Sequence, residues 1–599
     1  WSINMDELRG QMMDSAREAT WLPSFGLDRE LDWLRNMGDW MISKKRYWGL
    51  ALPIYPCAAC DHVTVVGSRA ELRESAVAGW PEFEGHSPHR PWVDEVVIAC
   101  EQCGAAVSRV PDVGNVWLDA GIVAFATLNY HQDREYWAQW FPADLVLEEF
   151  AGQFRNWFYA LLAMSTTLEG HAPFKTLLAY ATVKDAHGQG MHKSKGNAIW
   201  FDDAADWLGV EPLRWLFAAA PLERNVNFGR ALVDETARRL QPLWEVYRFF
   251  VTYANLEGWT PGVGSWGLGV GDEASQPPTP NSHLLDQWLL ARLNQLVVIS
   301  RQQLDAFDAR GFTLGIEAFL DDLSNWYVRR SRRRFWGAPQ SVVGHQSAAS
   351  CRQPAALPTA DCRLPADQQD AFATLYVTLV TLARLLAPVL PFLAESLYQN
   401  LVRELDPTAP ASVHLTGYPT ELKMQNEELR KAGDDVALLN SQFSILNSTA
   451  VVRHVVGLGR VARKSVGLRV RQPLARMLVV VQGAQERAAL LRHQGDLLEE
   501  LNVKAIELLD SSATLLSYRI KPNLRLLGPR LGKQLPTLRA ALEQLDLRAA
   551  GDVARAVVAG ETVTLPFGTS TLTLVPDELL VESAALAGYA VAQEGGVQV

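Results

Sequence analysis

Two pairs of cysteines constrain the fold of this chain more than any other feature of its sequence. They are Cys57 with Cys60 and Cys100 with Cys103, and two residues separate the cysteines of each pair. A tight turn of this kind directs both sulfurs at one ion, and two such turns supply the four ligands of a tetrahedral zinc site. Four thiolates leave no open coordination position, so we expect a structural zinc rather than a catalytic one. The alternative is four unrelated buried cysteines.

The composition describes a globular protein with several domains. A chain of 599 residues corresponds to about three or four domains. Its 48% hydrophobic and 21% charged residues fit sizeable cores. With six cysteines a disulfide scaffold is not indicated, so we expect a reducing cytoplasm. The sequence holds no apolar run close to the roughly 20 residues that cross a bilayer. A net charge of −11 argues against coating nucleic acid by bulk charge but permits a local basic patch.

A stretch of eight residues with two lysines, a serine and flanking glycines predicts a phosphate-binding loop. Residues 190–197 follow a strand expected over residues 177–183 and a short turn at 185–188, and they precede a helix expected from Asp202. Lysines on a glycine-rich loop beyond a strand can fold over a polyphosphate. The alternative is a solvated basic turn before a helix.

Two further segments supply candidates for a pocket. Residues 112–121, which contain Trp117 and Asp119, predict a strand followed by a glycine turn. Glu149, Gln153 and Trp157 recur every four residues, which predicts one face of one helix. A carboxylate, an amide and an indole aligned in this way could hold an amino group and wall an apolar pocket. The alternative is a helix with mixed core and surface contacts.

Basic residues beside aromatic ones occur twice. Lys44, Lys45 and Arg46 precede a Tyr-Trp pair, and residues 321–336 form a helical pattern with five arginines. In that pattern two arginine pairs recur at i and i+4, which predicts a basic ridge suited to RNA backbone contact and base stacking. The alternative is a solvated helix whose arginines pair with Asp321 or Asp322.

Several of these segments resemble signatures of the class I aminoacyl-tRNA synthetases. Residues 190–197 are similar to the Lys-Met-Ser-Lys-Ser loop, although its first lysine and first serine are absent. Residues 39–49 resemble the segment Asp-Trp-x-Ile-Ser-Arg-x-Arg-Tyr-Trp-Gly of the isoleucine, valine and leucine members. Residues 325–336 resemble a run of isoleucyl-tRNA synthetases, and this similarity favours isoleucine over valine or leucine.

The chain departs from the family at several positions. Phe150, Gly152 and Asn156 replace Gly, Asp and Gly of the family helix, which puts an ammonium contact there in question. Tyr180 and Ala181 replace the His-Gly pair that precedes the lysine loop, and an adenine contact there is equally in question. The first ATP-binding signature, His-x-Gly-His, is absent. We therefore expect the first half of the nucleotide fold and the editing domain to precede Trp1, and we expect this portion alone to be inactive.

The resemblance implies an isoleucine–tRNA ligase that uses ATP and Mg²⁺, acts on isoleucine and its tRNA, holds Zn²⁺, and is a monomer. The alternatives are a noncatalytic tRNA-binding module and a valine or leucine ligase. The implied fold is α/β plus all-α: an incomplete Rossmann-like catalytic half with a zinc-binding insertion, a helical anticodon-binding domain and a small α+β C-terminal region. The expected segments are, in that order, a connective segment at 1–55, the zinc insertion at 56–110, the catalytic half at 111–230, the anticodon-binding domain at 231–420 and the C-terminal region at 421–599.

The resemblance also assigns residues to roles. The catalytic residues are Lys193, Ser194 and Lys195. The ATP-binding residues are Gly190, Met191, His192, Lys193 and Ser194. The isoleucine and adenylate site comprises Trp117, Asp119, Glu149, Gln153 and Trp157. The tRNA-binding residues are Trp326, Arg329, Arg330, Arg333, Arg334 and Trp336. Basic segments at 460–464, 468–474 and 528–533 are expected either to contact tRNA or to pack.

Overall fold

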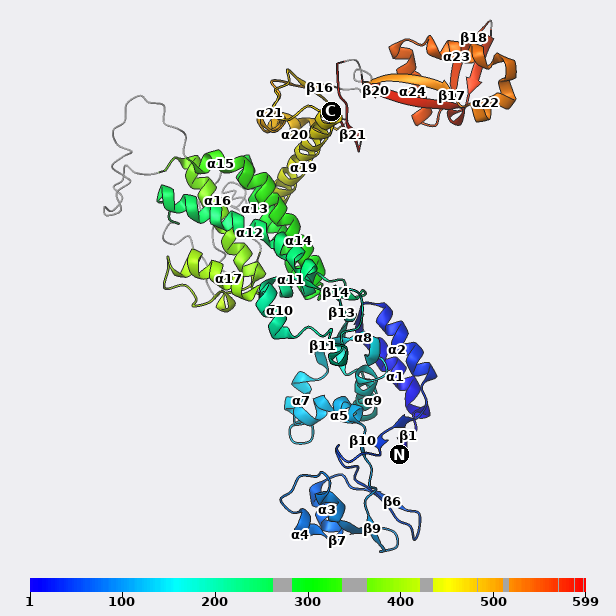
Figure 1. The fold of residues 1–599 in the computed structure, drawn as a ribbon, viewed down its shortest axis with the longest axis vertical. Helices are drawn as coiled ribbons and strands as arrows, with labels where there is room; N and C mark the ends of the chain where they lie inside the picture. The colour runs from blue at the N-terminus through cyan, green and yellow to red at the C-terminus, as the bar shows by residue number, and fades with distance from the viewer. Residues whose placement is uncertain are drawn as a thin grey trace. The chain divides into compact units, whose positions relative to one another are not determined.

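The computed structural model describes residues 1–261, 283–336, 364–420, 435–481, 483–509, 516–568, 570–585, 588–595 and 597–599 (Figure 1). Residues 337–366 are rich in Gly, Ser, Ala and Pro, which predicts a loose insertion. Most of this segment, 337–363, lies outside the described residues. The chain forms two compact units. The first comprises residues 1–245, 299–320 and 386–396, and the second comprises 246–298, 321–385 and 397–599.

A parallel three-stranded sheet organises the first unit. The strand order is β11 (Ala143–Glu149), β12 (Phe174–Tyr180) and β2 (Thr20–Leu22). Parallel strands need crossover connections, and α9 (Trp157–Glu169) supplies the one between β11 and β12. With α1 (Asp6–Glu18) and α2 (Phe25–Asn36), α9 covers one face of the sheet over a core that contains Trp21, Phe158, Phe174 and Leu177.

The opposite face of this sheet is open at β11. Leu145 is 37% exposed and Leu147 is 52% exposed. β11 also pairs with a neighbour on one side only within the described residues. Parallel sheets are normally covered on both faces, so β11 departs from this rule within the described residues.

Two smaller bodies flank the sheet in sequence. Between β5 (Ile54–Pro56) and β9 (Ala106–Ser108), the chain forms a small module with its own core around Tyr55 and Phe83. It contains the hairpin β5–β6 and the antiparallel sheet β7–β8–β9, in which β6 is Val63–Val65, β7 is Ala76–Ala78 and β8 is Val97–Ala99. Its helices are α3 (Arg69–Ser75) and α4 (Trp80–Phe83).

Beyond the sheet, the parallel pair β13 (Val183–Asp185) and β14 (Val226–Phe228) frames the lysine loop. Within that loop, residues Lys193–Lys195 form the 3₁₀ turn η2. Two helices, α10 (Phe201–Leu208) and α11 (Val210–Ala219), complete this body. A local core around Leu213, Leu216 and Phe228 fixes them.

Helices fill much of the second unit. Their bounds are α12 (Arg230–Glu257), α13 (Leu284–Asp305), α14 (Ala309–Asp321), α15 (Arg329–Phe335), α16 (Ala366–Leu386), α17 (Pro391–Tyr398) and α19 (Asp435–Ser465), and parts of α12, α13, α14 and α17 belong to the first unit. A π-helical segment, η3 (Asp322–Val328), joins α14 to α15. Ring contacts at 4.9–5.1 Å link Phe335 to Phe372 and Phe249 in the interior.

The last part of the second unit is α+β. One body has a four-stranded sheet in the order β16–β15–β22–β21. Its strands are β15 (Met477–Val480), β16 (Ile506–Leu509), β21 (Gln593–Glu594) and β22 (Val597–Gln598). Its helices are α20 (Ala484–Arg492) and α21 (Gln494–Leu501). The other pairs β17 (Leu516–Pro522) with β20 (Leu579–Ala585) and β18 (Val563–Phe567) with β19 (Ser570–Leu574), and it carries α22 (Leu524–Leu531), α23 (Leu535–Glu543) and α24 (Leu547–Val558). No helix in the described ranges is long and apolar enough to cross a membrane.

Candidate functional site

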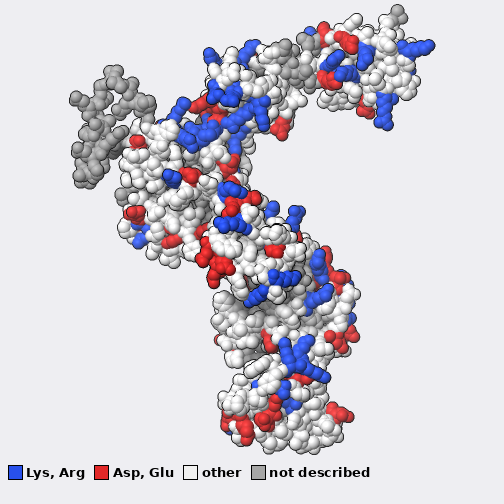
Figure 2. Space-filling view, viewed as in Figure 1, with Lys and Arg blue, Asp and Glu red and all other residues white. Residues whose placement is uncertain are grey.

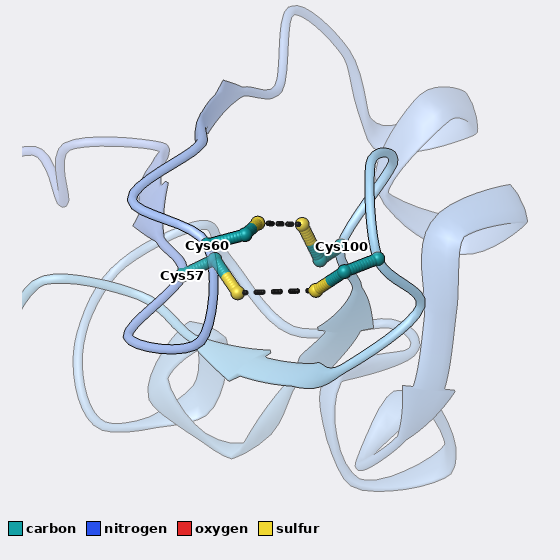
Figure 3. Close-up of side chains that lie close together, drawn as sticks. Cys57, Cys60 and Cys100 are labelled. Carbon is teal, nitrogen blue, oxygen red and sulfur yellow. Dashed lines mark hydrogen bonds between the residues drawn. The ribbon is translucent and has the colours of Figure 1, made fainter.

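The structure brings all four predicted zinc ligands together (Figure 3). Their sulfurs lie within 4.8 Å of one another, and Cys57–Cys103 and Cys60–Cys100 are each 3.6 Å apart. Zn–S bonds of about 2.3 Å in a tetrahedron place sulfurs about 3.8 Å apart. The cluster therefore fits a zinc ion bound by four thiolates.

The two cysteine turns repeat the same backbone geometry. Asp61 N donates to Cys57 O at 3.0 Å, and Gly104 N donates to Cys100 O at 2.8 Å. Asp61 and Gly104 both have positive φ, 58° and 73°. Cys57 N and Cys100 N close the turns on His62 O and Ala105 O, each at 2.8 Å. The module thus builds two equivalent knuckles, and His62 contributes its carbonyl to the turn while its ring faces Glu101 at 3.6 Å.

Trp117 and Asp119 lie on a helix, which corrects the predicted strand and glycine turn. The strand β10 is only Val113–Gly114, and α5 runs over Val116–Gly121. The helix starts here because the side chain of Asn115 accepts a hydrogen bond from Trp117 N at 3.2 Å, which caps its first turn. Burial raises the pKa of Asp119, although the charge of His89 opposes the shift.

Glu149, Gln153 and Trp157 do not share one helix, which is a second correction. Glu149 ends β11, Gln153 ends the short helix α8 (Phe150–Gln153), and Trp157 begins α9. The interruption lies at Asn156, whose φ and ψ are −119° and −96°. Gln153 and Trp157 are still in contact, because Gln153 Oε1 accepts a hydrogen bond from Trp157 N at 3.2 Å.

The helices that carry Trp117 and Trp157 are in close contact. Trp157 Nε1 donates to Ala120 O at 3.1 Å. A Cβ at Gly121 would lie 2.7 Å from Ala160 O, so only glycine allows α5 to approach α9 this closely. At the adjacent strand end, Thr182 Oγ1 donates to Glu149 Oε1 at 2.8 Å. Glu149 therefore lies at the C-terminal end of β11, and Gln153 and Trp157 follow it, at the edge where ligands of open α/β sheets bind.

A hollow of about 440 Å³ adjoins Trp117. Lys44, Arg46 and Arg155 contribute cations to its wall, and Trp33, Trp40 and Tyr159 contribute rings. The guanidinium of Arg155 lies 5.4 Å from the centroid of Trp33. This hollow unites part of the basic run at 44–46 with Trp117, a pairing that sequence spacing does not reveal.

A second hollow, about 450 Å³ in volume, lies at the same ends of β11 and β12 and is mostly apolar. Leu147, Leu178, Tyr180 and Ala181 line it together with Phe217. Tyr180 and Ala181 are the residues that replace the His-Gly pair of the family.

The base of the lysine loop is fixed by two polar side chains. Asp185 Oδ1 accepts from His187 N and Gln189 N at 3.0 and 2.8 Å, and Asp185 Oδ2 accepts from Asn197 Nδ2 at 2.9 Å. Asn197 Oδ1 in turn accepts from His192 N at 2.9 Å. Neither residue belongs to a site predicted from the sequence by itself, although an Asp before a His-Gly turn is a common turn signal.

The tip of the loop is exposed and has little side-chain contact. The ammonium of Lys193 lies 4.5 Å from the centroid of Trp200, which is 56% exposed. Neither Lys193 nor Lys195 forms an ion pair with a described residue, and none of the described contacts joins the tip to Trp117, Gln153 or Trp157. Both ammonium groups are free to meet an anionic ligand.

The arginine ridge is split between two faces of α15. On the inner face, Arg330 pairs with Asp496, and its guanidinium lies 4.7 Å from the ring of Trp326, which is 6% exposed. Arg334 donates to Asp286 Oδ1 and Oδ2 at 2.7 and 2.6 Å. These partners differ from Asp321 and Asp322, because Asp322 instead pairs with Arg292 and Arg453.

The outer face of α15 carries the accessible members of the predicted tRNA-binding set. Arg333 has a side chain that is 85% exposed, Arg329 is 41% exposed, and Trp336 is 50% exposed. In Figure 2 the largest concentration of basic side chains lies over the region of α15 and α19. A direct role in RNA contact is compatible with this outer face, while the inner face is occupied by ion pairs and packing.

Two protein families match the chain. The family described as tRNA synthetases class I (I, L, M and V) matches residues 1–229. The anticodon-binding domain of tRNA ligase matches residues 355–478. The first range contains the parallel sheet, the cysteine module and the lysine loop, and the second contains much of the helical part of the second unit.

Curated relatives match from end to end. The isoleucine–tRNA ligase of Thermus thermophilus is 37% identical over 601 residues, which cover 100% of this chain and 52% of the relative. The isoleucine–tRNA ligase of Deinococcus radiodurans is 35% identical over 608 residues, which cover 100% and 50%. The chain therefore spans about half the length of the curated relatives it matches. Among solved structures, methionyl-tRNA synthetase of Mycobacterium tuberculosis in complex with methionyl-adenylate aligns with 70% of this chain and 67% of that chain, at 18% identity and a TM-score of 0.44.

The fold, the cysteine cluster and both family matches agree on one class, and the chain belongs to the class I aminoacyl-tRNA synthetases. This confirms the predicted fold class, with a catalytic fragment on a parallel sheet, a four-cysteine module and a helical anticodon-binding domain. Within the class, the chain is a homologue of isoleucine–tRNA ligase that covers about half of the full enzyme.

Proposed function

We propose that this chain carries the second half of the aminoacylation site of an isoleucine–tRNA ligase. In this reaction a carboxylate oxygen of isoleucine attacks the α-phosphorus of ATP, pyrophosphate leaves, and the acyl group then passes to the terminal ribose of isoleucine tRNA. Mg²⁺ accompanies ATP. One set of contacts supports the proposal most. Glu149 at the end of β11 accepts from Thr182 just beyond β12, Trp157 contacts the helix that carries Trp117, and the lysine loop follows β13.

In this proposal the lysine loop acts on the phosphates. Lys193 and Lys195 supply movable positive charge that offsets the negative charge developing on the leaving pyrophosphate. Gly190, Met191, His192 and Ser194 belong to the same loop, and the Asp185–Asn197 contact sets where its base lies.

The amino-acid side of the site needs an apolar wall and a few polar groups. Trp117 and Trp157 supply the wall, since α5 and α9 hold them through the Trp157–Ala120 hydrogen bond. Gln153 and Glu149 supply polar atoms, and each has one oxygen or nitrogen beyond the contact described above. Asp119 completes the predicted set on α5.

The cysteine module is proposed to hold one structural Zn²⁺ through Cys57, Cys60, Cys100 and Cys103. Bound there, the ion cross-links the two knuckles and supplies folding energy rather than reactivity. Four thiols that are not in disulfides also support a reducing compartment, and we propose a cytoplasmic monomer.

We propose that these 599 residues alone do not form isoleucyl-adenylate. The exposed leucines of β11 and its single sheet neighbour support this, because the strand lacks the cover that a complete nucleotide fold gives. Isoleucine-dependent ATP–pyrophosphate exchange by the isolated chain is the test, and robust exchange contradicts the proposal.

The DNA upstream of the Trp1 codon adds a second test. An in-frame segment encoding His-x-Gly-His would allow the longer protein to be assayed with isoleucine, valine and leucine. If valine or leucine drove exchange and isoleucine did not, that amino acid would be the substrate in place of isoleucine.

A noncatalytic tRNA-binding module is the second candidate. The accessible arginines on the outer face of α15 favour it, because RNA contact through them needs no ATP site. A stop codon with a start site directly upstream, together with tRNA binding and no exchange activity in any form of the protein, would support this candidate.

A further inference from the structure

The segment Leu468–Leu474 follows α19 and forms a loop whose ends are fixed. α19 ends at Ser465, and Gly467 adopts the left-handed conformation with φ +71°. Leu468 N donates to Arg463 O at 2.9 Å, which turns the chain out of the helix. At the far end Leu474 N donates to Asn502 O at 3.1 Å and its carbonyl accepts from Lys504 N at 3.0 Å. We call Leu468–Leu474 the basic loop.

A buried arginine determines the path of the basic loop. Arg463 is 4% exposed and donates four hydrogen bonds to backbone carbonyls. Two of these belong to the loop, Arg469 O at 3.2 Å and Gln472 O at 2.9 Å. The other two belong to the end of α21, Leu501 O at 2.6 Å and Asn502 O at 3.2 Å. Arg463 therefore ties the loop to α21 through neutral partners only.

With its carbonyls occupied in this way, the loop presents its own cations to solvent. Arg469 and Arg471 are exposed, as is Lys464 at the end of α19. None of the three forms an ion pair within the ranges that the structure describes. Asn502 Nδ2 donates to Val470 O at 3.0 Å, which fixes the residue between the two arginines.

The basic loop is connected to the outer face of α15 through one carboxylate. Glu500, 4% exposed in its side chain, accepts from Arg329 Nη2 at 2.8 Å and from Arg460 Nη2 at 2.6 Å. Arg460 lies on α19 less than one turn before Arg463. The accessible cations of this surface are Arg329, Arg332, Arg333, Arg460, Lys464, Arg469 and Arg471.

The carboxylates nearby offset little of this charge. Glu500 is buried under Arg329, Arg330 and Arg460. Asp496 pairs with Arg330 on the inner face. Glu499 is 65% exposed and lies 3.4 Å from Arg333. On a protein with net charge −11 this surface is a local reversal of sign (Figure 2).

We infer that the basic loop is an RNA-contacting element that extends the outer face of α15, with Arg469 and Arg471 binding phosphates and Arg463 as their positioning residue. The inference rests on the proposed function, which supplies a tRNA. RNA fits this surface better than an acidic protein does, because six of the seven cations are arginines and Trp336 exposes a ring beside them. The loop lies inside the range matched by the anticodon-binding domain family.

The test measures binding of the full chain to an isoleucine tRNA transcript at several salt concentrations. Arg469→Ala combined with Arg471→Ala should weaken binding roughly tenfold or more and reduce the salt slope by about 1.5, since two phosphate contacts are lost. Arg539→Ala, an exposed arginine on α23, is the control for lost charge and should change neither quantity.

The outcomes separate this inference from the proposed function. Weakening by Arg333→Ala but not by the loop variants overturns the inference and leaves tRNA binding intact. Absence of tRNA binding by the unmodified chain contradicts the proposed function as well. Equal loss of binding to polyglutamate and to the transcript would mark the loop as a general polyanion or acidic-protein surface and overturn the RNA assignment.

The positioning role of Arg463 has its own measurement. Arg463→Lys keeps the charge but cannot serve four carbonyls, so tRNA affinity should fall as in the loop variants. Trypsin cleavage after Arg469 and Arg471 should quicken in this variant, and the transcript should protect these bonds in the unmodified chain. Faster cleavage with unchanged tRNA affinity and salt slope would reduce Arg463 to a purely structural residue.

Discussion

Asn197 donates a hydrogen bond from Nδ2 to Asp185 Oδ2 at 2.9 Å, and this contact closes the base of the lysine loop. The two residues are twelve positions apart, on either side of the turn that carries Lys193 and Lys195. Because Asn197 also binds Gly190 O and His192 N, a single amide organises most of the loop. The position of the two lysines therefore depends on Asn197 at the end of the loop and on Asp185, which lies outside the loop signature.

Asp185→Asn should loosen the loop without unfolding the protein. The new amide nitrogen can face Asn197 Nδ2, so two donors meet and the closing contact is lost. Trypsin should then cleave after Lys193 and Lys195 severalfold faster, while the melting temperature changes little because Asp185 and Asn197 are only half-buried. Asp203→Asn, on the first turn of α10, is the matched control. An unchanged cleavage rate would show that Asp185 does not hold the loop.

The same loop should depend on pH in the acid range. Hydrogen bonds from Asn197 and from the N–H groups of Gln189 and His187 hold the pKa of Asp185 below its usual value. A lowered pKa means that the contribution to stability is complete above the ordinary value of about 3.9 and is lost as the pH falls through the lowered pKa. Exchange of the Gln189 amide hydrogen, corrected for its intrinsic rate, should accelerate below about pH 3.9. In Asp185→Asn this acid-dependent step should be missing.

One zinc ion per chain is the expected metal content. Purified protein should contain about one zinc by elemental analysis, and Cys100→Ser should abolish it and lower the melting temperature, since the module then lacks a ligand. Cys351→Ser is the control, because this cysteine lies outside both Cys-x-x-Cys pairs of the sequence. If the Cys100 variant retained its zinc, the metal would be bound at a site other than the four cysteines.

Trp200 should lower the reactivity of Lys193 in the ligand-free chain. A cation–π contact at an exposed site is worth about 0.5–1 kcal/mol, so losing it should raise Lys193 availability roughly two- to fivefold. Competitive acetylation read by mass spectrometry should show this increase in Trp200→Leu, with Lys195 as the internal reference. Trp207→Leu, which removes another exposed indole from α10, should leave the ratio unchanged.

Local patterns in the sequence predicted some elements well. The apolar period of residues 6–18 predicts an amphipathic helix, which is α1. The alternation at 562–565 and 571–574 predicts two short strands, which are β18 and β19. The helix expected from Asp202 begins at Phe201. Each of these has a period that its own residues display. The closeness of the four cysteine sulfurs was also predictable, since two short spacings define the two knuckles.

Features that depend on distant partners were not predictable in this way. The spacing of Glu149, Gln153 and Trp157 fits one helix, but the backbone leaves the helix at Asn156. The helical period of residues 321–336 gives no sign of the π-helical segment η3. The partners of Arg330 and Arg334 lie 166 and 48 positions away in Asp496 and Asp286, so no local pattern could divide the ridge into an inner and an outer face. Arg463 was noted only as part of a basic segment, and its four carbonyl partners come from folding.

The two faces of α15 predict different effects for two variants, a loss of stability for Arg334→Ala and a loss of tRNA binding for Arg333→Ala. Arg334 is 10% exposed and faces Asp286, whose side chain is fully buried and also accepts from Tyr327 at 2.7 Å. Arg334→Ala leaves that carboxylate in the interior without its charged partner, which should cost about 3–5 kcal/mol of unfolding free energy. Arg333→Ala removes an 85% exposed side chain and should cost less than about 0.5 kcal/mol.

Chemical denaturation measures the first effect, and tRNA binding measures the second. Arg333→Ala should weaken binding and reduce the salt slope by about 1, because a phosphate contact is lost. Arg334→Met offers a milder probe of the inner face, since it keeps the aliphatic stem while removing the charge. If Arg334→Met retained full stability while Arg333→Ala lost several kcal/mol, the assignment of the two faces of α15 would be reversed.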